Sequence, residues 1–346
     1  MTSLRLRYAK GVALGAAVIA WWLAAGQPSG AQGRPAANDE LEVLPVQGRV
    51  SMLAGAGGNV TVQVGPQGVL LVDTGRADTS AKVLAAVRAL SKGPVRYIIN
   101  TNVDGDHTGG NAALSVAGSP MPGSAQGLSV GAPIIAHENV LNRMDAPTGQ
   151  PSKVPAEFWP TTTFFTPKKT FAFNDDPIEI IWHPAAHTDG DVLVFFRASD
   201  VVSVGDVMNT TAYPMIDLAR GGSIQGELDA LNRIIDITIP RVNQMGGTRV
   251  IPGHGRVCNE ADVVEYRDMA TVVRDRVKTL IDKRMTLEQV QAARPTYEYD
   301  PLYGSDTGPW TTKMFVEAVY QSLSRAAAAS SLPAKPAAPK GAPRGK

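Results

Sequence analysis

The chain has 346 residues, 44% of them hydrophobic and 19% charged, which is enough for one large globular domain with additional segments. Its 33 Lys and Arg residues balance 32 Asp and Glu residues, and the formal net charge of +1 excludes an overall positive field that would attract nucleic acid. The only cysteine is Cys258, which excludes an internal disulfide.

The first 31 residues are typical of a secretory signal peptide. Arg5, Arg7 and Lys10 precede an apolar run over residues 11–25, and small residues follow up to Ala31. The apolar run is shorter than the roughly 20 residues of a membrane-spanning helix, which favours cleavage over a membrane anchor, an alternative that the sequence leaves open. We therefore expect a periplasmic or secreted protein without stable membrane insertion after cleavage.

The next segments predict the fold. Residues 32–45 begin with polar and small residues, and we expect a flexible lead-in there. From residue 46, short apolar stretches separated by glycine predict antiparallel strands that lead into a buried strand. A helix over residues 79–90 and a second series of strands and helices follow. Two strand-rich halves with helices outside predict an α/β fold, a four-layer αββα sandwich, over residues 46–258.

The C-terminal part of the chain changes character after residue 258. Residues 259–325 show helical spacing of apolar residues, and we expect helices packed on the core. Residues 326–346 are rich in Ala, Pro and Lys and contain no aromatic residue. This composition predicts a disordered tail.

Polar residues suited to metal binding follow several of the predicted strands. The segment INTNVDGDHTGGN places four of them in a glycine-rich loop, and HTDGD, VGD and PGHG each follow a further strand. Turns alone would explain any single segment, but they explain the recurrence of His and Asp at four strand ends poorly. Imidazole and carboxylate groups that converge from strand ends are typical of a hydrolytic metal centre. The candidate residues are Asn102, Asp104, Asp106, His107, His187, Asp206 and His254.

The order of VDTG, TNVDGDHTGGN, HTDGD, VGD and PGHG resembles the metallo-β-lactamase fold hydrolases, a superfamily that includes glyoxalase II and lactamases. In that family, the first loop reads H-x-H-x-D-H and its ligands hold two zinc ions. The resemblance implies that Asp73 of VDTG braces the metal loop by hydrogen bonds. It also implies a complete second zinc site made of Asp106, His107, Asp206 and His254.

The first zinc site departs from the family pattern. Asn102 and Asp104 stand where the family has two histidines, and only His187 remains of that set. An amide and a carboxylate lower the affinity for zinc and shift the preference toward harder ions. We therefore expect one tightly bound Zn²⁺ and a second site that is weak or altered, with iron or manganese left open as the metal.

The candidate catalytic residues are Asp106 and Asp104. The metal is expected to activate a water molecule, and the position of Asp104 permits it to take a proton from that water. The resemblance implies hydrolysis of an ester, amide, lactone, lactam or thioester bond in a small-molecule substrate. Asn209 stands where well-known lactamases have a lysine that binds the carboxylate of the drug, which argues against efficient penicillin hydrolysis.

Two other functions stay open. One is a catalytically silent metal-binding protein of the same fold, suggested by the loss of two imidazoles from the first site. The other is a single-iron enzyme that acts on persulfides or in redox chemistry, as some relatives in the family do. The sequence predicts no nucleic-acid partner and does not define the substrate or the oligomeric state.

Overall fold

The computed structural model describes residues 41–123, 131–145, 150–244 and 246–330. The signal peptide predicted for residues 1–31 lies outside these ranges, as do residues 32–40 of the lead-in and residues 331–346 of the tail. Among the described residues, none of the helices combines the length and the apolar character needed to span a membrane.

The first half of the described chain forms a seven-stranded sheet in the order β1-β2-β3-β4-β5-β6-β7. The strands from β1 to β4 pair antiparallel, and those from β4 to β7 pair parallel. Parallel pairing places the carboxyl ends of β4, β5 and β6 at the same edge of the sheet. The strands are β1 (Glu42–Gln47), β2 (Val50–Ala54), β3 (Val60–Gly65), β4 (Gly68–Val72), β5 (Val95–Ile99), β6 (Ile134–His137) and β7 (Thr162–Phe164).

The second half forms a six-stranded sheet in the order β13-β12-β11-β10-β9-β8. Its neighbours pair antiparallel except β11 and β12, which are parallel. The carboxyl ends of β11 and β12 therefore lie side by side. The strands are β8 (Lys168–Phe173), β9 (Asp176–His183), β10 (Asp191–Phe196), β11 (Val201–Asn209), β12 (Arg249–His254) and β13 (Cys258–Asn259).

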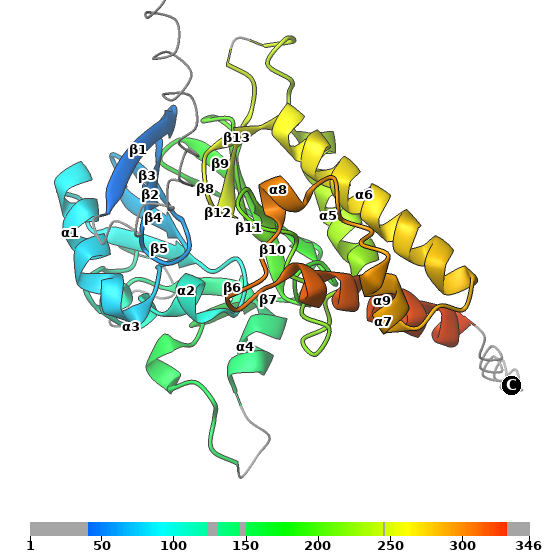
Figure 1. Ribbon diagram of the computed structural model, residues 1–346. Coiled ribbons are helices and arrows are strands. Elements are labelled where there is room, and N and C mark those ends of the chain that lie inside the picture. Colours follow the sequence, from blue (N-terminus) through cyan, green and yellow to red (C-terminus); the bar gives the residue numbers. More distant parts are fainter. Residues whose placement is uncertain (1–40, 124–130, 146–149, 245, 331–346) are drawn as a thin grey trace, which may run out of the picture. The chain divides into compact units, whose positions relative to one another are not determined.

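Helices cover the outer faces of both sheets (Figure 1). The first sheet is covered by α1 and α3, and the second by α5, α6 and α9. The short helices α2 and α4 follow β5 and β6. The helices and 3₁₀ turns are η1 (Ala77–Thr79), α1 (Ser80–Leu90), α2 (Gly105–Thr108), α3 (Asn111–Val116), α4 (Glu138–Met144), η2 (Ala156–Phe158), α5 (Ile224–Ile237), α6 (Glu260–Asp282), α7 (Leu287–Ala292), α8 (Asp300–Tyr303) and α9 (Thr312–Ser330).

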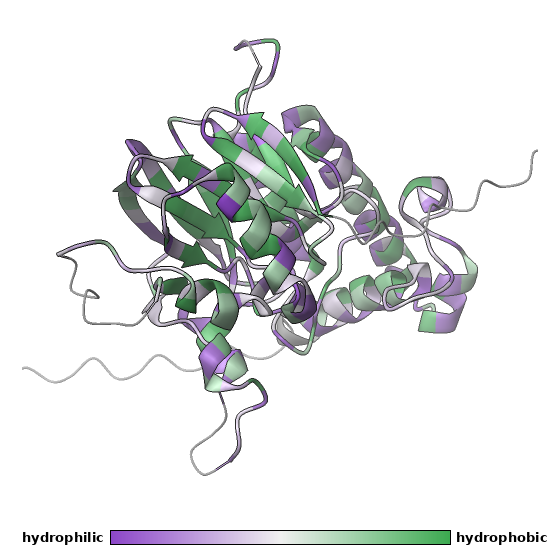
Figure 2. Ribbon diagram, turned by 90° about the vertical axis from the view of Figure 1, so that its left-hand side faces the viewer, coloured by the Kyte–Doolittle hydropathy of each residue, from purple (hydrophilic) through white to green (hydrophobic). Residues whose placement is uncertain are grey.

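Three apolar cores separate the four layers. The central core lies between the two sheets and contains Met52, Leu70 and Ile99 from one sheet with Ile180 and Phe196 from the other. Two outer cores lie between each sheet and its helices. The strands are accordingly hydrophobic along most of their length, whereas the helices carry both hydrophilic and hydrophobic residues (Figure 2). The predicted four-layer αββα sandwich with C-terminal helices is confirmed.

Element boundaries differ from the prediction in two places. Strand β1 begins at Glu42, within the predicted lead-in of residues 32–45, because pairing with β2 orders this segment. Pro45 is tolerated in β1 because β1 is an edge strand. Helix α9 continues to Ser330 and so includes the first residues of the predicted tail of residues 326–346. Alanine has the highest helix propensity, which explains why the alanines after Arg325 extend the helix.

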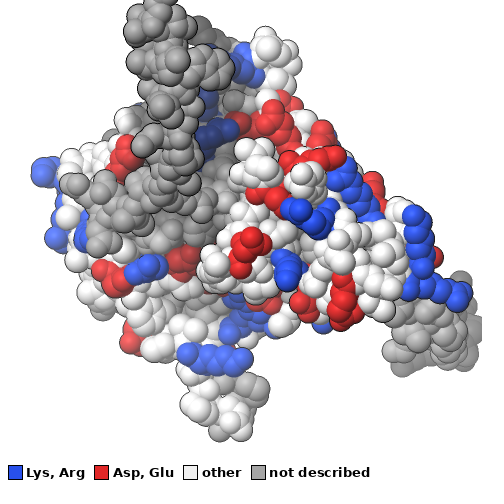
Figure 3. All heavy atoms as spheres, in the orientation of Figure 1, with Lys and Arg blue, Asp and Glu red and all other residues white. Residues whose placement is uncertain are grey.

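On the face shown in Figure 3, Lys and Arg side chains are intermixed with Asp and Glu side chains. This distribution agrees with the nearly balanced composition of the chain. The absence of a nucleic-acid partner stays a prediction.

Candidate metal centre

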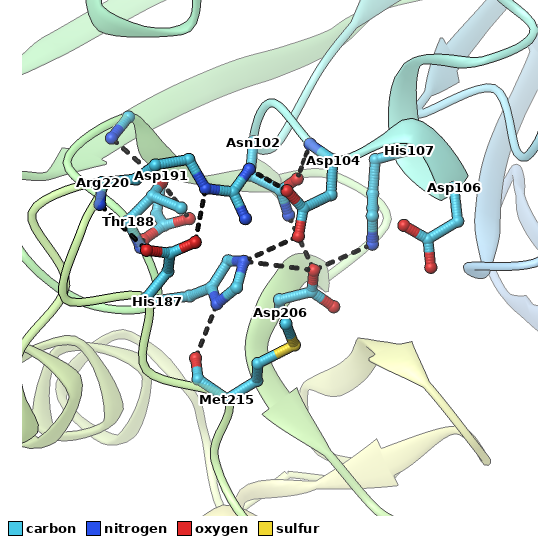
Figure 4. A network of polar contacts seen from close by, with 12 residues as sticks. Asn102, Asp104, Asp106, His107, His187, Thr188, Asp191, Asp206, Met215 and Arg220 are labelled. Atoms are coloured by element: carbon cyan, nitrogen blue, oxygen red, sulfur yellow. Dashed lines mark hydrogen bonds and ion pairs between the residues drawn. The ribbon is translucent and has the colours of Figure 1, made fainter. Parts of the chain in front are cut away.

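The predicted site residues lie together where strands of both sheets end. The loop after β5 and the start of α2 provide four of them, the loop between β9 and β10 provides His187, β11 provides Asp206, and β12 ends at His254. Six of the seven offer ligand atoms in two groups, each with all atoms within 4.8 Å of one another; Figure 4 labels all of these residues except His254. The first group is Asp106, His107 and His254, and the second is Asp104, His187 and Asp206.

The glycine of the PGHG segment allows β12 to approach β11. A Cβ atom on Gly253 would collide with Oδ1 of Asp206 and with the backbone of Gly205. Any larger residue at position 253 would therefore push His254 away from Asp206. This is the physical reason for a glycine directly before this candidate ligand.

His107 is oriented by Asp73, as the resemblance implied. Nδ1 of His107 donates a hydrogen bond of 2.8 Å to Oδ2 of Asp73, which also accepts one of 2.7 Å from the Thr101 hydroxyl. Because a carboxylate is only an acceptor, Nδ1 carries the proton and Nε2 points toward the site. Nε2 is buried, makes no hydrogen bond, and lies 3.1 Å from Oδ2 of Asp206.

These contacts fit a divalent cation at the first group. Nε2 of His254 lies 3.3 Å from Oδ2 of Asp106 and 3.3 Å from Oδ1 of Asp206. Lone pairs on these nitrogen and oxygen atoms repel one another unless a proton or a cation lies between them. Two imidazoles and carboxylate oxygens are a donor set that suits zinc. Nε2 of His107 can pair with Asp206 through a shared proton, and a cation would take the place of that proton.

His187 belongs to the second group and is held by a backbone carbonyl. Its Nδ1 donates a hydrogen bond of 2.6 Å to the carbonyl oxygen of Met215, so Nε2 faces the site. Nε2 lies 3.0 Å from Oδ2 of Asp104 and 3.8 Å from Oδ2 of Asp206. His187 is fully buried, whereas the Asp104 side chain is 17% exposed.

Asn102 lies in the site but does not present a ligand atom. Its Oδ1 accepts a hydrogen bond of 2.8 Å from the backbone N–H of Asp104, and its Nδ2 donates one of 3.0 Å to Oδ2 of Asp206. A flipped amide would place its oxygen against the carboxylate, so the two contacts fix the orientation. This geometry disagrees with the expectation that Asn102 binds the metal. Asn102 instead positions Asp104 and Asp206.

Arg220 is a site residue that the sequence analysis missed. Its guanidinium forms an ion pair through Nη1 with Oδ1 of Asp104, and its Nε donates a hydrogen bond of 2.6 Å to Asp217 (Figure 4). The segment around Arg220 carries no recognisable motif, and 116 residues separate Arg220 from Asp104. No sequence signal pointed to this contact.

Proton sharing stabilises the cluster when no cation is bound. Burial alone lowers the pKa of His187 and His254, but hydrogen bonds and the negative charges of nearby Asp residues outweigh it and raise the pKa to about 10 and about 9, respectively. The pKa of His107 is raised for the same reasons. The pKa of Asp206 is lowered despite its burial, chiefly by the charge of His107.

The environment of Asp104 makes it a weak base. Burial raises the pKa of Asp104, but hydrogen bonds from His187 and Arg220 outweigh it and lower the pKa to about 2. A carboxylate with so low a pKa has little tendency to take a proton near neutral pH. In the metal-free chain Asp104 is therefore held as a carboxylate, and its role as the proton acceptor stays a prediction.

A comparison with known proteins identifies the family of the chain. The chain matches the model of the metallo-β-lactamase superfamily over residues 54–254. This chain belongs to the metallo-β-lactamase superfamily. Proteins of this superfamily bind divalent metals, commonly zinc, and the two groups of candidate ligands agree with that property. No curated protein matches the chain.

Solved structures of the metallo-β-lactamase superfamily share the fold at low identity. A metallo-β-lactamase from Pontibacter korlensis is 18% identical, with a TM-score of 0.50 over 67% of this chain and 99% of that chain. The stereoselective inverting sec-alkylsulfatase Pisa1 from Pseudomonas sp. is 15% identical, with a TM-score of 0.56 over 81% of this chain and 50% of that chain. This chain therefore spans about half the length of the alkylsulfatase.

The raised histidine pKa values predict how the metal-free protein responds to pH. Because the folded pKa values of His187 and His254 are about 10 and about 9, their protonation stabilises the fold fully below pH about 6.5. This contribution is lost as the pH rises through about 9 to 10. We expect the melting temperature of chelator-treated protein to fall between pH 7 and 10, measured by circular dichroism. The melting temperature of zinc-loaded protein should fall less over the same pH range. An equal fall in both forms would contradict the prediction.

Asp73→Asn is expected to weaken metal binding. Asparagine tolerates the positive φ of 64° at this position, but it no longer provides a charged acceptor for His107. Loss of such a bracing carboxylate lowers metal affinity about 10- to 100-fold. Competition with a fluorescent zinc chelator measures the effect, and the exposed Asp78→Asn is the control. An unchanged affinity in Asp73→Asn would show that the brace is unimportant.

Proposed function

We propose that this chain is a metal-dependent hydrolase that holds one zinc ion through Asp106, His107, Asp206 and His254. The substrate class proposed is a small molecule with an ester, amide, lactone, lactam or thioester bond. The observation that carries the proposal is the convergence of ring nitrogens on one carboxylate: Nε2 of His107 and Nε2 of His254 lie 3.1 and 3.3 Å from the two oxygens of Asp206. Two imidazoles and carboxylate oxygens in such proximity are a donor set that suits zinc.

The residues around the first group support hydrolytic chemistry. When bound, a divalent cation in such a site lowers the pKa of water and polarises a substrate carbonyl. The side chains of Asp106 and His254 are 32% and 28% exposed, so the substrate would approach from their side. Asp106 and Asp104 are the proposed acceptors of the proton from the attacking water; Asp106 is paired with His254 and is more exposed, and Asp104 is held by Arg220 and His187.

A cavity that includes Met215, the residue whose carbonyl holds His187, is a candidate for the non-reacting part of the substrate. Its volume is about 340 Å³; Met215, Leu218, Trp310 and Met314 line it together with the polar residues Asp217, Glu317 and Gln321. The Met215 carbonyl holds His187, and Figure 4 shows the Met215 side chain reaching toward Asp206. This cavity would suit a substrate with both an apolar and a polar group.

The side chain of Asn209 offers no charge to a substrate carboxylate. Its Oδ1 accepts hydrogen bonds of 2.8 Å from the backbone N–H and the hydroxyl of Thr211. The residue therefore closes a turn at the end of β11. Weak penicillin hydrolysis remains part of the proposal.

Two alternatives remain, and the first group distinguishes them. A catalytically silent protein would have no need for the partly exposed Asp106 and His254 beside the buried His107 and Asp206. An iron enzyme acting on persulfides would purify with iron and colour, whereas the proposal predicts colourless protein with zinc.

Export to the periplasm or the medium, with cleavage after residue 31, is also proposed on the sequence of the first segment.

Activity depends on the first group in this proposal. Chromogenic esters, lactones and cephalosporins form the assay panel, together with a secondary alkyl sulfate, because the similarity to the alkylsulfatase fold covers 81% of this chain. His254→Ala should lower kcat/KM by more than about 100-fold and lower zinc content, since it removes a direct ligand. Arg256→Ala, two residues away with a 65% exposed side chain, is the control. Full activity in His254→Ala would contradict the proposal.

A further inference from the structure

We propose that the guanidinium of Arg220 takes the place of a second metal ion, so that each chain binds a single divalent cation. The inference rests on the proposed metal-dependent function and specifies which groups supply the positive charge in the site. It concerns the second group, where Asp104, His187 and Asp206 would otherwise hold a cation.

Hydrogen-bond donors already point at the oxygen atoms of the second group. Nη1 of Arg220 forms an ion pair with Oδ1 of Asp104. Nδ2 of Asn102 donates to Oδ2 of Asp206, the same oxygen that lies 3.8 Å from Nε2 of His187. A cation bound here would lie close to these N–H groups and be repelled by them. The residues present therefore do not fit a second divalent ion, although they fit one at the first group.

The charges make Arg220 a permanent counter-ion of the site. Three carboxylates, those of Asp104, Asp106 and Asp206, face the site, and Asp217, which also contacts Arg220, adds a fourth. One divalent cation together with the Arg220 guanidinium supplies three positive charges against these four negative ones, so Arg220 provides part of the compensation that a second cation would otherwise supply. Arginine retains its charge at every relevant pH, so this compensation does not depend on metal supply.

Arg220 is fixed in place by the loop that also positions His187. Its Nε contacts Asp217, whose other oxygen, Oδ1, accepts hydrogen bonds of 2.9 Å from the backbone N–H groups of Ala219 and Arg220. The backbone N–H of Asp217 donates to the carbonyl oxygen of His187 at 2.9 Å, and that of Asp189 donates to the carbonyl oxygen of Arg220 at 2.9 Å. The guanidinium is therefore an internal part of the site, with its side chain 27% exposed.

Zinc stoichiometry tests the inference without relying on activity. Each protein is equilibrated by dialysis against buffer with a slight excess of zinc chloride, and zinc per chain is measured by elemental analysis. The wild type should hold one equivalent, and Arg220→Ala should hold two, because removal of the guanidinium leaves Asp104 and His187 free to bind. Arg220→Gln is a second neutral variant and should also hold two zinc equivalents. Arg220→Lys keeps the positive charge and should hold one. Arg197→Ala, whose side chain is 52% exposed, is the surface control and should hold one.

The outcomes are distinct. Two equivalents in the wild type would overturn the role of Arg220 while leaving the metallohydrolase proposal intact. One equivalent in a folded Arg220→Ala or Arg220→Gln, with folding checked by circular dichroism, would also overturn it. No zinc in the wild type would overturn the proposed function itself, and the inference with it.

Discussion

The carboxylate of Asp206 is the group on which the candidate site depends. Its side chain is only 9% exposed, and its two oxygen atoms lie within 3.3 Å of ring nitrogens from His107 and His254 and accept a hydrogen bond from Asn102. A buried carboxylate is costly unless neighbouring charges and hydrogen bonds compensate for it. Segments from both halves of the sandwich provide that compensation, so the same contacts that satisfy Asp206 assemble the site.

The fold supplies the rigidity that such an assembly requires. Asp73 follows β4 in the left-handed region at a φ of 64°, a conformation that is unfavourable for most residues other than glycine. The hydrogen bonds from Thr101 and His107 to its carboxylate compensate for this conformation. Because Asp73 and Thr101 lie at the ends of two paired parallel strands, β4 and β5, the orientation of His107 is fixed by the sheet.

Sequence patterns predicted the fold and the composition of the site, but not all of its contacts. Alternating and continuous apolar runs predict the strands, and His and Asp at their ends identify His107, His187, Asp206 and His254. The role of Arg220 depends on a contact with Asp104 that exists only after folding. The role of Asn102 depends on which atom of its amide faces Asp206, and residue type alone does not determine this. Strand β1 was missed because pairing orders it, a tertiary effect.

Anomalous diffraction at the zinc edge, from crystals of zinc-loaded protein, shows whether these four side chains bind a common cation. We expect one strong anomalous peak per chain, bounded by Asp106, His107, Asp206 and His254. A peak elsewhere, or ligand side chains that point away from one another around no peak at all, would contradict it.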